Sequence, residues 1–336
     1  MTQSTIIKRP SQLISILMII VGGILLGWVL YDSFQSKPLP FERVLVDEGN
    51  PKKFPKLGIL KNDDLVIRKY EIRSEGVDKP LAEFHIAKQG TSAPIPLSWR
   101  SKLAEPLLIS DVEPEAEKKV ADVIAKHLPK NGLVFSWWDN SRRLKLYNNI
   151  PVAFDDAVPD PIFVPAIWQN QRNKIVNAEK AFWGMDQTAP TLNKNFTEFH
   201  SALLLDQVDG VSAMRKIAKD KKIFVVLNLL DAYKIGTISP KKFGVGFKDF
   251  PRSKQSHGLI KGVKAWVKEN GYTAYSVYPY GETVIRIFFL TDEVSKHTLL
   301  AALLPFNSSK PGQVPGTKLV YQHRGYWVYE ITDQKK

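Results

Sequence analysis

The feature that most constrains this chain is an uncharged, strongly apolar run near its N-terminus, from Leu13 to Tyr31. It extends for 19 residues, and no other stretch of the 336-residue sequence is comparable. At about 1.5 Å of rise per residue, such a run is about 28 Å long as a helix, close to the hydrocarbon thickness of a bilayer. The sequence therefore predicts a transmembrane helix over residues 13–31.

The charges around this run predict its orientation. Lys8 and Arg9 stand before it, whereas Asp32 follows it directly. Because cytoplasmic flanks carry the excess of Lys and Arg, we expect residues 1–12 in the cytoplasm and the main domain in the periplasm. The alternative is a cleaved signal peptide, which also has a basic start. Tyr31 to Gln35 offers no small-residue cleavage site, which favours an uncleaved, single-pass anchor in the inner membrane.

Cysteine is absent from the whole sequence. This excludes disulfides, Cys nucleophiles, thiolate zinc sites, thiolate-held iron–sulfur clusters and the attachment motif of c-type haem. The six histidines lack the spacing of a metal motif, although a site assembled from distant histidines stays open. No nucleophile–base pair or phosphate-binding loop is recognisable. We expect no cofactor, no metal site and no catalytic residue, and thus a protein that is not an enzyme.

The part of the chain outside the predicted anchor is basic. With Lys8 and Arg9 left aside, 45 Lys and Arg stand against 34 Asp and Glu, a net charge of +11. Such an excess favours an acidic partner protein or the anionic head groups of the lipid bilayer. The cations are scattered and form no nucleic-acid-binding motif, so we expect no nucleic acid. A basic surface that only keeps the domain soluble is the alternative.

Composition divides the rest of the chain into three parts. Residues 32–56 contain four prolines and several charges, which predicts a linker. Residues 57–110 hold short alternating apolar runs, such as Leu65–Ile67 and Ala82–Ile86, which predict a β-rich membrane-proximal region. Residues 111–336 instead show helical apolar stripes that alternate with apolar strand segments.

In residues 111–336 a helical apolar stripe is followed three times by an apolar strand segment. The stripe of the first unit runs from Ala116 to His127, and the three strand segments are Leu133–Phe135, Ile223–Leu227 and Tyr272–Tyr278. A hairpin partner at 283–290, a helix at 292–304 and a final hairpin of 318–321 with 326–331 follow. We therefore predict an α/β periplasmic domain with a mixed sheet covered by helices.

The most distinctive segment, FSWWDNSRR, directly follows the first of these strands. Ligand crevices form at the carboxyl ends of strands in open α/β sheets, so this segment is a candidate binding lip. Its tryptophans can stack on a ring, and its arginine can hold an anion. In the alternative interpretation one tryptophan is core, the aspartate caps the following helix and the arginines are solvated. The candidate ligand- or partner-binding residues are Trp137, Trp138, Asp139, Ser141, Arg142, Asp155 and Asp156.

Three carboxylates, Asp155, Asp156 and Asp160, lie close together after this segment. Neighbouring carboxylates can bind a hard metal ion or form an acid–base pair. No calcium-loop pattern is present, however, and the surrounding prolines are typical of a solvated surface loop.

A second candidate surface lies on the predicted helix that contains Leu259, Val263, Trp266 and Val267. Lys261, Lys264 and Lys268 lie away from that apolar face, and with Lys241, Lys242, Arg252 and Lys254 just before the helix we interpret them as the densest basic patch. We interpret them as a docking surface for an acidic partner, although such a helix face is usually only solvated.

The order of these motifs resembles the extracytoplasmic C-terminal domains of membrane oligosaccharyltransferases. Those domains carry a W-W-D-Y-G motif after a strand, whereas Asn140 and Ser141 here replace its last two residues. The many transmembrane helices that hold that family's catalytic carboxylates are missing. The resemblance implies a fold and argues against transferase activity.

Over most of its length the chain also resembles the HaoB family of hydroxylamine oxidation proteins, in its single anchor, its cysteine-free outer domain and its FSWWDNSRR segment. This resemblance implies a membrane-anchored periplasmic accessory protein with a scaffold or assembly role in hydroxylamine oxidation. Its implied partners are hydroxylamine oxidoreductase or other periplasmic multihaem cytochromes. The alternative is a small-ligand or glycan-binding domain with its site at Trp137, Trp138 and Asp139.

Overall fold

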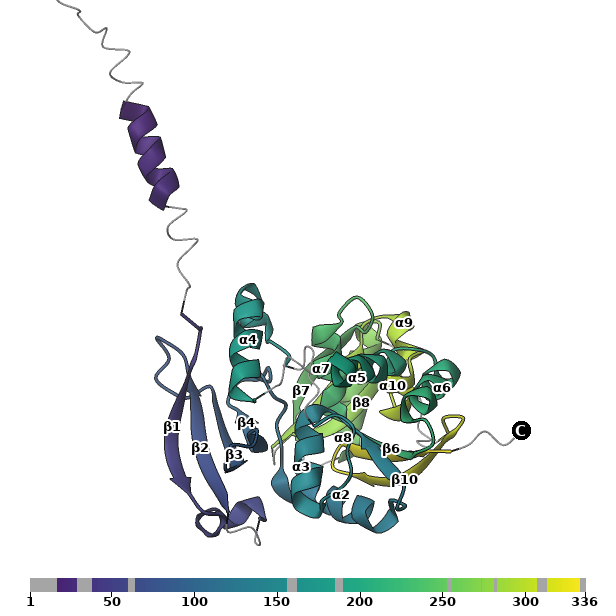
Figure 1. Cartoon of the computed structure of the whole chain (residues 1–336). Helices are drawn as coiled ribbons and strands as arrows, with labels where there is room; N and C mark the ends of the chain where they lie inside the picture. The colour runs from purple at the N-terminus through teal and green to yellow at the C-terminus, as the bar shows by residue number, and fades with distance from the viewer. Residues whose placement is uncertain are drawn as a thin grey trace, which may run out of the picture. The chain divides into compact units, whose positions relative to one another are not determined.

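The computed structural model describes residues 17–28, 38–59, 64–155, 162–184, 190–252, 256–272, 274–280, 283–306 and 313–332 (Figure 1). Contacts divide the chain into two units, Met1–Pro40 and Phe41–Lys336. In the first, residues 17–28 are helical, while residues 13–16 and 29–31 of the predicted anchor lie outside the described residues. Across the described ranges, no helix has both the length and the apolar character needed to cross a bilayer.

The second unit begins with a four-stranded antiparallel sheet in sequential order (Figure 1). Its strands are β1 (Glu42–Gly49), β2 (Leu65–Arg73), β3 (Ala82–Gln89) and β4 (Ile95–Ser101). Strand β1 lies inside residues 32–56, so the prediction of a linker there was wrong for this stretch. The prolines that suggested a linker flank the strand and do not interrupt it. They stand at 38 and 40 before β1, and in the short 3-10 helices η1 (Pro51–Lys53) and η2 (Pro55–Leu57) after it.

A second, mixed sheet has the order β10 (Thr317–His323), β11 (Tyr326–Ile331), β6 (Lys222–Asn228) and β5 (Gly132–Phe135). Strands β5 and β6 are parallel, and the other neighbours are antiparallel. Helix α2 (Pro114–His127) leads into β5 and α6 (Gln207–Ala218) leads into β6, which confirms the first two predicted helix–strand units. His127, expected on the apolar stripe of α2, is exposed because the helix ends there.

A core between α2 and this sheet explains why these segments fold as they do. Val120 and Ile124 of α2 pack with Val134 of β5, Phe224 of β6 and Val328 of β11. Each of these side chains is at most 2% exposed. Six consecutive residues of β6, from Ile223 to Asn228, are buried, as expected for a strand covered on both faces.

The third predicted unit belongs to a separate antiparallel sheet, ordered β7 (Val245–Pro251), β9 (Val284–Leu290) and β8 (Tyr275–Tyr280). The predicted hairpin of its last two strands is confirmed. Helix α8 (Ser256–Glu269) buries Val263 and Val267 against Ile287 and Phe289 of β9. The mixed α/β class is therefore confirmed, but the helix–strand units divide between two sheets because β8 pairs with its hairpin neighbour.

Further helices lie along the chain. They are α3 (Trp138–Asn148), η3 (Ala166–Gln171), α4 (Arg172–Phe182), α5 (Pro190–Leu203), α7 (Leu229–Ile238), α9 (Glu293–Lys296) and α10 (Leu299–Leu303). The helix predicted over 292–304 is divided into α9 and α10. Thr298 causes the break, because its side chain accepts a hydrogen bond from the backbone N–H of Ala301 and so caps a new helix.

Candidate functional site

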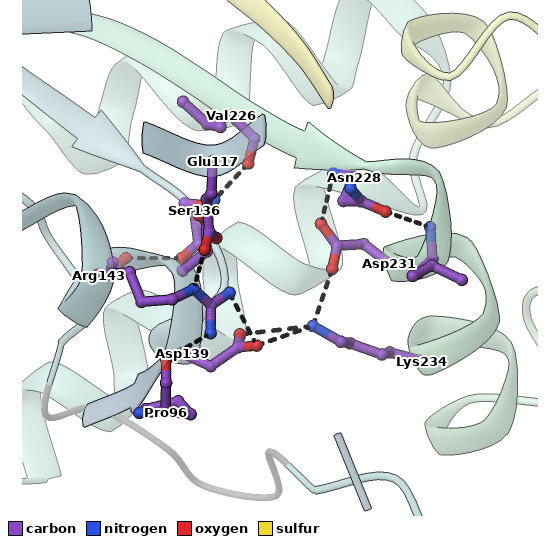
Figure 2. Close-up of polar contacts among 12 residues, drawn as sticks. Pro96, Glu117, Ser136, Asp139, Arg143, Val226, Asn228, Asp231 and Lys234 are labelled. Carbon is purple, nitrogen blue, oxygen red and sulfur yellow. Dashed lines mark hydrogen bonds and ion pairs between the residues drawn. The ribbon is translucent and has the colours of Figure 1, made fainter. Parts of the chain in front are cut away.

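The candidate site lies at the carboxyl ends of the parallel strands β5 and β6, where α3 and α7 begin (Figure 2). The Ser136 hydroxyl, just beyond β5, donates to the carbonyl of Val226 in β6 at 2.8 Å. On the β6 side, the Asn228 side chain accepts from the N–H of Leu230, and the Asp231 carboxylate accepts from the N–H of Asn228 at 2.8 Å. This reciprocal capping box fixes the start of α7 beside the start of α3.

A row of alternating charges crosses this region. The Asp139 carboxylate is bonded by Nη2 of Arg143, one turn later on α3, at 3.2 Å. The guanidinium of Arg143 also forms an ion pair through Nε with Glu117 of α2, and it donates through Nη1 to the carbonyl of Pro96 in β4 at 3.2 Å. Arg143 therefore connects two helices of the α/β region with the first sheet.

The row continues on the other side of Asp139. Nζ of Lys234, on α7, lies 3.4 Å from Oδ1 of Asp139 and 3.0 Å from Oδ1 of Asp231. Figure 2 shows Arg143 between Glu117 and Asp139, and Lys234 between Asp139 and Asp231. We call these five residues the charge chain.

The charge chain is almost completely removed from solvent. Each of its five residues is at most 4% exposed. Neutral donors complete its two ends, where the Tyr326 hydroxyl donates to Glu117 at 3.1 Å and the backbone N–H of Asn228 donates to Asp231. Buried charges are tolerated when they are paired and hydrogen-bonded, and this arrangement meets that condition for each member.

Burial and neighbouring charges change the pKa values of the three carboxyl groups in different directions. Burial raises the pKa of Glu117 to about 7, despite the nearby Arg143. Burial also raises the pKa of Asp231. Burial opposes the ionisation of Asp139 too, but Lys234 and Arg143 outweigh it and lower the pKa of Asp139. Asp139, in the middle of the charge chain, is thus the carboxylate most strongly held in its ionised form.

The two tryptophans that we expected at a binding lip are buried. Trp137 is 3% exposed and Trp138 is 1% exposed. Trp137 packs edge-on against Phe196 of α5, and Trp138 packs against Trp183. The interpretation of this segment as an exposed aromatic lip was therefore wrong, because helices that follow in the sequence cover it. The glycan-binding alternative loses the exposed aromatic surface on which it depended.

The remaining predicted site residues divide between the interior and the surface. Ser141 is fully buried, and the buried Arg142 donates to the carbonyls of Pro94, Trp183 and Asp155. The alternative interpretation expected solvated arginines. It was wrong on this point, because Arg142 and Arg143 are both buried. The Asp155 carboxylate is partly exposed and pairs with Lys145 at 2.6 Å. Asp156, like Asp160, lies outside the described residues.

The sequence interpretation missed most of the charge chain. Of its five members, only Asp139 was among the predicted site residues. The four that were missed are Glu117, Arg143, Asp231 and Lys234. Two signals were present: the spacing of four between Asp139 and Arg143, and the N-x-x-D capping pattern directly after the apolar strand β6. In the described ranges, no three His, Asp or Glu side chains converge as they would to hold a metal ion.

Comparison with known protein families gives a match over nearly the whole chain. A family model described as the HaoA-associated protein HaoB, with a name that refers to nitrification, matches residues 8–331. No curated protein matches the sequence. Among solved structures, the C-terminal domain of C. jejuni PglB is similar, with a TM-score of 0.31 and 12% identity over 65% of this chain and 100% of that one. Nothing about function follows from a likeness this weak.

The fold and the site together define a mixed α/β protein with a buried chain of charges that pair with one another. Because the family model covers nearly the whole sequence, the chain belongs to the HaoB family. The predicted family resemblance is thereby confirmed.

The raised pKa of Glu117 predicts an unusual pH dependence of stability. In the unfolded chain the Glu117 carboxyl ionises near pH 4.5, whereas in the folded protein it ionises near 7. The folded state therefore binds the proton more tightly, and this contribution to stability is lost as the pH rises from 4.5 to 7. We expect the free energy of unfolding of the native protein, relative to that of Glu117→Gln, to fall by about 3 kcal/mol over this range.

Urea denaturation of both proteins at a series of pH values measures this difference. Glu115→Gln, in the exposed first turn of the same helix, is the matched control and should show no such change. A constant difference between the native protein and Glu117→Gln across the series would contradict the assignment.

Proposed function

We propose that this chain is a membrane-anchored periplasmic accessory protein of hydroxylamine oxidation, which binds hydroxylamine oxidoreductase and has a scaffold or assembly role. The observation that carries this proposal is the HaoB family match over residues 8–331, because the family is described as HaoA-associated. Association with a partner, and not chemistry of its own, is the function that this description supports.

The geometry of the charge chain is consistent with a protein that does no chemistry at this site. Its acids and bases contact one another and neutral protein donors, and they are buried beneath helices. A catalytic acid or base must reach the proton that it transfers, either directly or through one water molecule. The charge chain therefore supports a structural interpretation of the FSWWDNSRR segment.

The anchor is the second part of the proposal. The uncharged run from Leu13 to Tyr31 and the cations before it support a single-pass anchor with the main domain in the periplasm. A tether at the inner membrane would hold a soluble partner close to the bilayer and raise its effective concentration there.

The exposed face of α8 is the surface that we propose for docking. Lys261, Lys264 and Lys268 are exposed, whereas Val263 and Val267 of the same helix are buried against β9. Ile260 lies beside the lysines and is 52% exposed, so the face combines positive charge with an apolar contact. Such a surface suits an acidic partner that is first attracted over a distance and then packs.

The orientation can be tested by protease accessibility. If the main domain is periplasmic, protease added to intact spheroplasts should digest it, and sealed inverted vesicles should protect it. An antibody against an epitope after β11 would follow the intact domain. Survival in spheroplasts together with digestion in inverted vesicles would contradict the orientation.

The docking surface can be tested by association kinetics. We expect reversal of Lys261, Lys264 and Lys268 to glutamate to slow association with hydroxylamine oxidoreductase severalfold at low salt and to have little effect at high salt. Folding should be unaffected, because these side chains are exposed. The measurement is the association rate of the detergent-solubilised full chain over a salt series.

The matched control for this experiment reverses Lys126, Lys130 and Lys221, exposed lysines outside α8, which changes the net charge by the same amount. Equal slowing by both triple variants would show that net charge alone matters. Either that result or an association rate independent of salt would eliminate α8 as the docking face.

A further inference from the structure

Two helical elements are packed at the point where the chain enters the second unit. Phe41, the first residue of that unit, stacks on Trp168 of η3 with ring centroids 4.9 Å apart. Helix α4 lies beside β1 (Figure 1), where Arg43 forms an ion pair with Glu179. Cζ of Arg43 also lies 4.3 Å from the ring centroid of Phe182, at the end of α4. Both η3 and α4 are therefore held beside the entry point of the chain.

The connection between this entry point and the proposed anchor is short. Ten Cα–Cα steps, from position 31 to position 41, separate Tyr31 at the end of the apolar run from Phe41. A chain of this length spans at most about 35 Å when it is fully extended. With the apolar run across the bilayer, as we propose, Phe41 stays within this distance of the outer end of the anchor. Because η3 is packed on Phe41, it is kept near the membrane as well.

Two apolar side chains are exposed at this end of the unit. Ile167 of η3, next to the buried Trp168, is 58% exposed, and η3 contains no charged residue. Val77, in the turn from β2 to β3, is 46% exposed. That turn follows Arg73, which pairs with Glu42 at the start of β1. Apolar side chains of this kind are removed from water when they enter the interfacial region of a bilayer.

The helix that continues from η3 is positively charged. The cations of α4 are Arg172, Lys174 and Lys180. Its one acid, Glu179, is 1% exposed and is neutralised by the ion pair with Arg43. The neighbouring β2–β3 turn carries charges of both signs, so the positive charge at this end of the unit comes from α4. Anionic lipid head groups attract such a surface.

We propose that η3 and the first turn of α4 rest on the anionic outer surface of the bilayer, with Ile167 among the lipid head groups and Lys174 against their phosphates. The inference rests on the proposed anchor and adds a second contact with the same membrane. A small surface is sufficient for this contact, because the short connection to the anchor keeps the local concentration of head groups high. The contact restricts rotation of the unit about its connection, so the same surfaces always face a partner.

The absence of cysteine from the sequence allows one fluorescent label to be placed at a chosen position. The full chain with Ile167→Cys, labelled with the dye NBD, is reconstituted into nanodiscs of phosphatidylglycerol and phosphatidylethanolamine that contain a lipid with a nitroxide on its head group. Val208→Cys on α6 is the matched control, because Val208 is 53% exposed. We expect the nitroxide to quench the label that replaces Ile167 severalfold more than the label that replaces Val208. Equal quenching of the two labels would overturn the inference and leave Ile167 available to a protein partner.

The lipid composition and a charge variant test the role of the head groups. In nanodiscs of phosphatidylcholine, quenching of the label that replaces Ile167 should fall severalfold. In the anionic nanodiscs, Lys174→Gln should also reduce it, whereas Lys216→Gln, an exposed lysine of α6, should not. Equal quenching in both lipids, or no effect of Lys174→Gln, contradicts the assignment to anionic head groups.

A separate measurement keeps the anchor distinct from this contact. The anchored chain should elute with the nanodiscs in high salt, which screens charges but does not release a membrane-spanning helix. Release of the chain from the nanodiscs would contradict the proposed anchor, and the inference with it. A chain that is retained, but whose two labels are quenched equally, contradicts the inference alone.

Discussion

The pairing of Asp139 with both Arg143 and Lys234 is the interaction on which the rest of the structure depends. Placing an ion in the interior costs several kcal/mol, and this cost is offset only when opposite charges and hydrogen bonds surround it. Asp139 meets two cations from two helices, and each cation meets a second carboxylate. Helices α2, α3 and α7 can therefore satisfy their buried charges only in one mutual arrangement.

The same segment also joins the first sheet to the α/β region. Arg143 donates to the carbonyl of Pro96, and its neighbour Arg142 donates to the carbonyl of Pro94. Two adjacent arginines thus hold the backbone at the start of β4. This arrangement explains why a polar sequence such as FSWWDNSRR is buried.

The sequence predicted the elements that have a strong and local signal. The apolar stripe of α2, the buried run of β6 and the hairpin of β8 and β9 were found because periodicity, length and turn residues act within a few positions. Helix α7 was not predicted, because its residues are buried on nearly every side and give no amphipathic pattern. Strand β1 was hidden by the prolines that flank it.

The site was harder to predict than the fold. Asp139 and Arg142 were correctly singled out as unusual, but their polarity was interpreted as exposure. Their partners lie far away in the sequence, at Glu117, Lys234 and Pro94, and no local pattern reports that such partners exist. Burial of a charged residue follows from contacts of this kind, which are fixed only in the folded chain.

The most direct test of the structural role of this segment is the free energy of unfolding of Asp139→Asn, measured by urea denaturation. The substitution keeps the shape of the side chain but removes the charge between Arg143 and Lys234, so a loss of about 3 to 5 kcal/mol is expected. Asp122→Asn, which alters an exposed ion pair with Lys118, should cost less than about 1 kcal/mol. A cost for Asp139→Asn as small as that of Asp122→Asn would contradict the account, because the charge chain would then not hold the fold together.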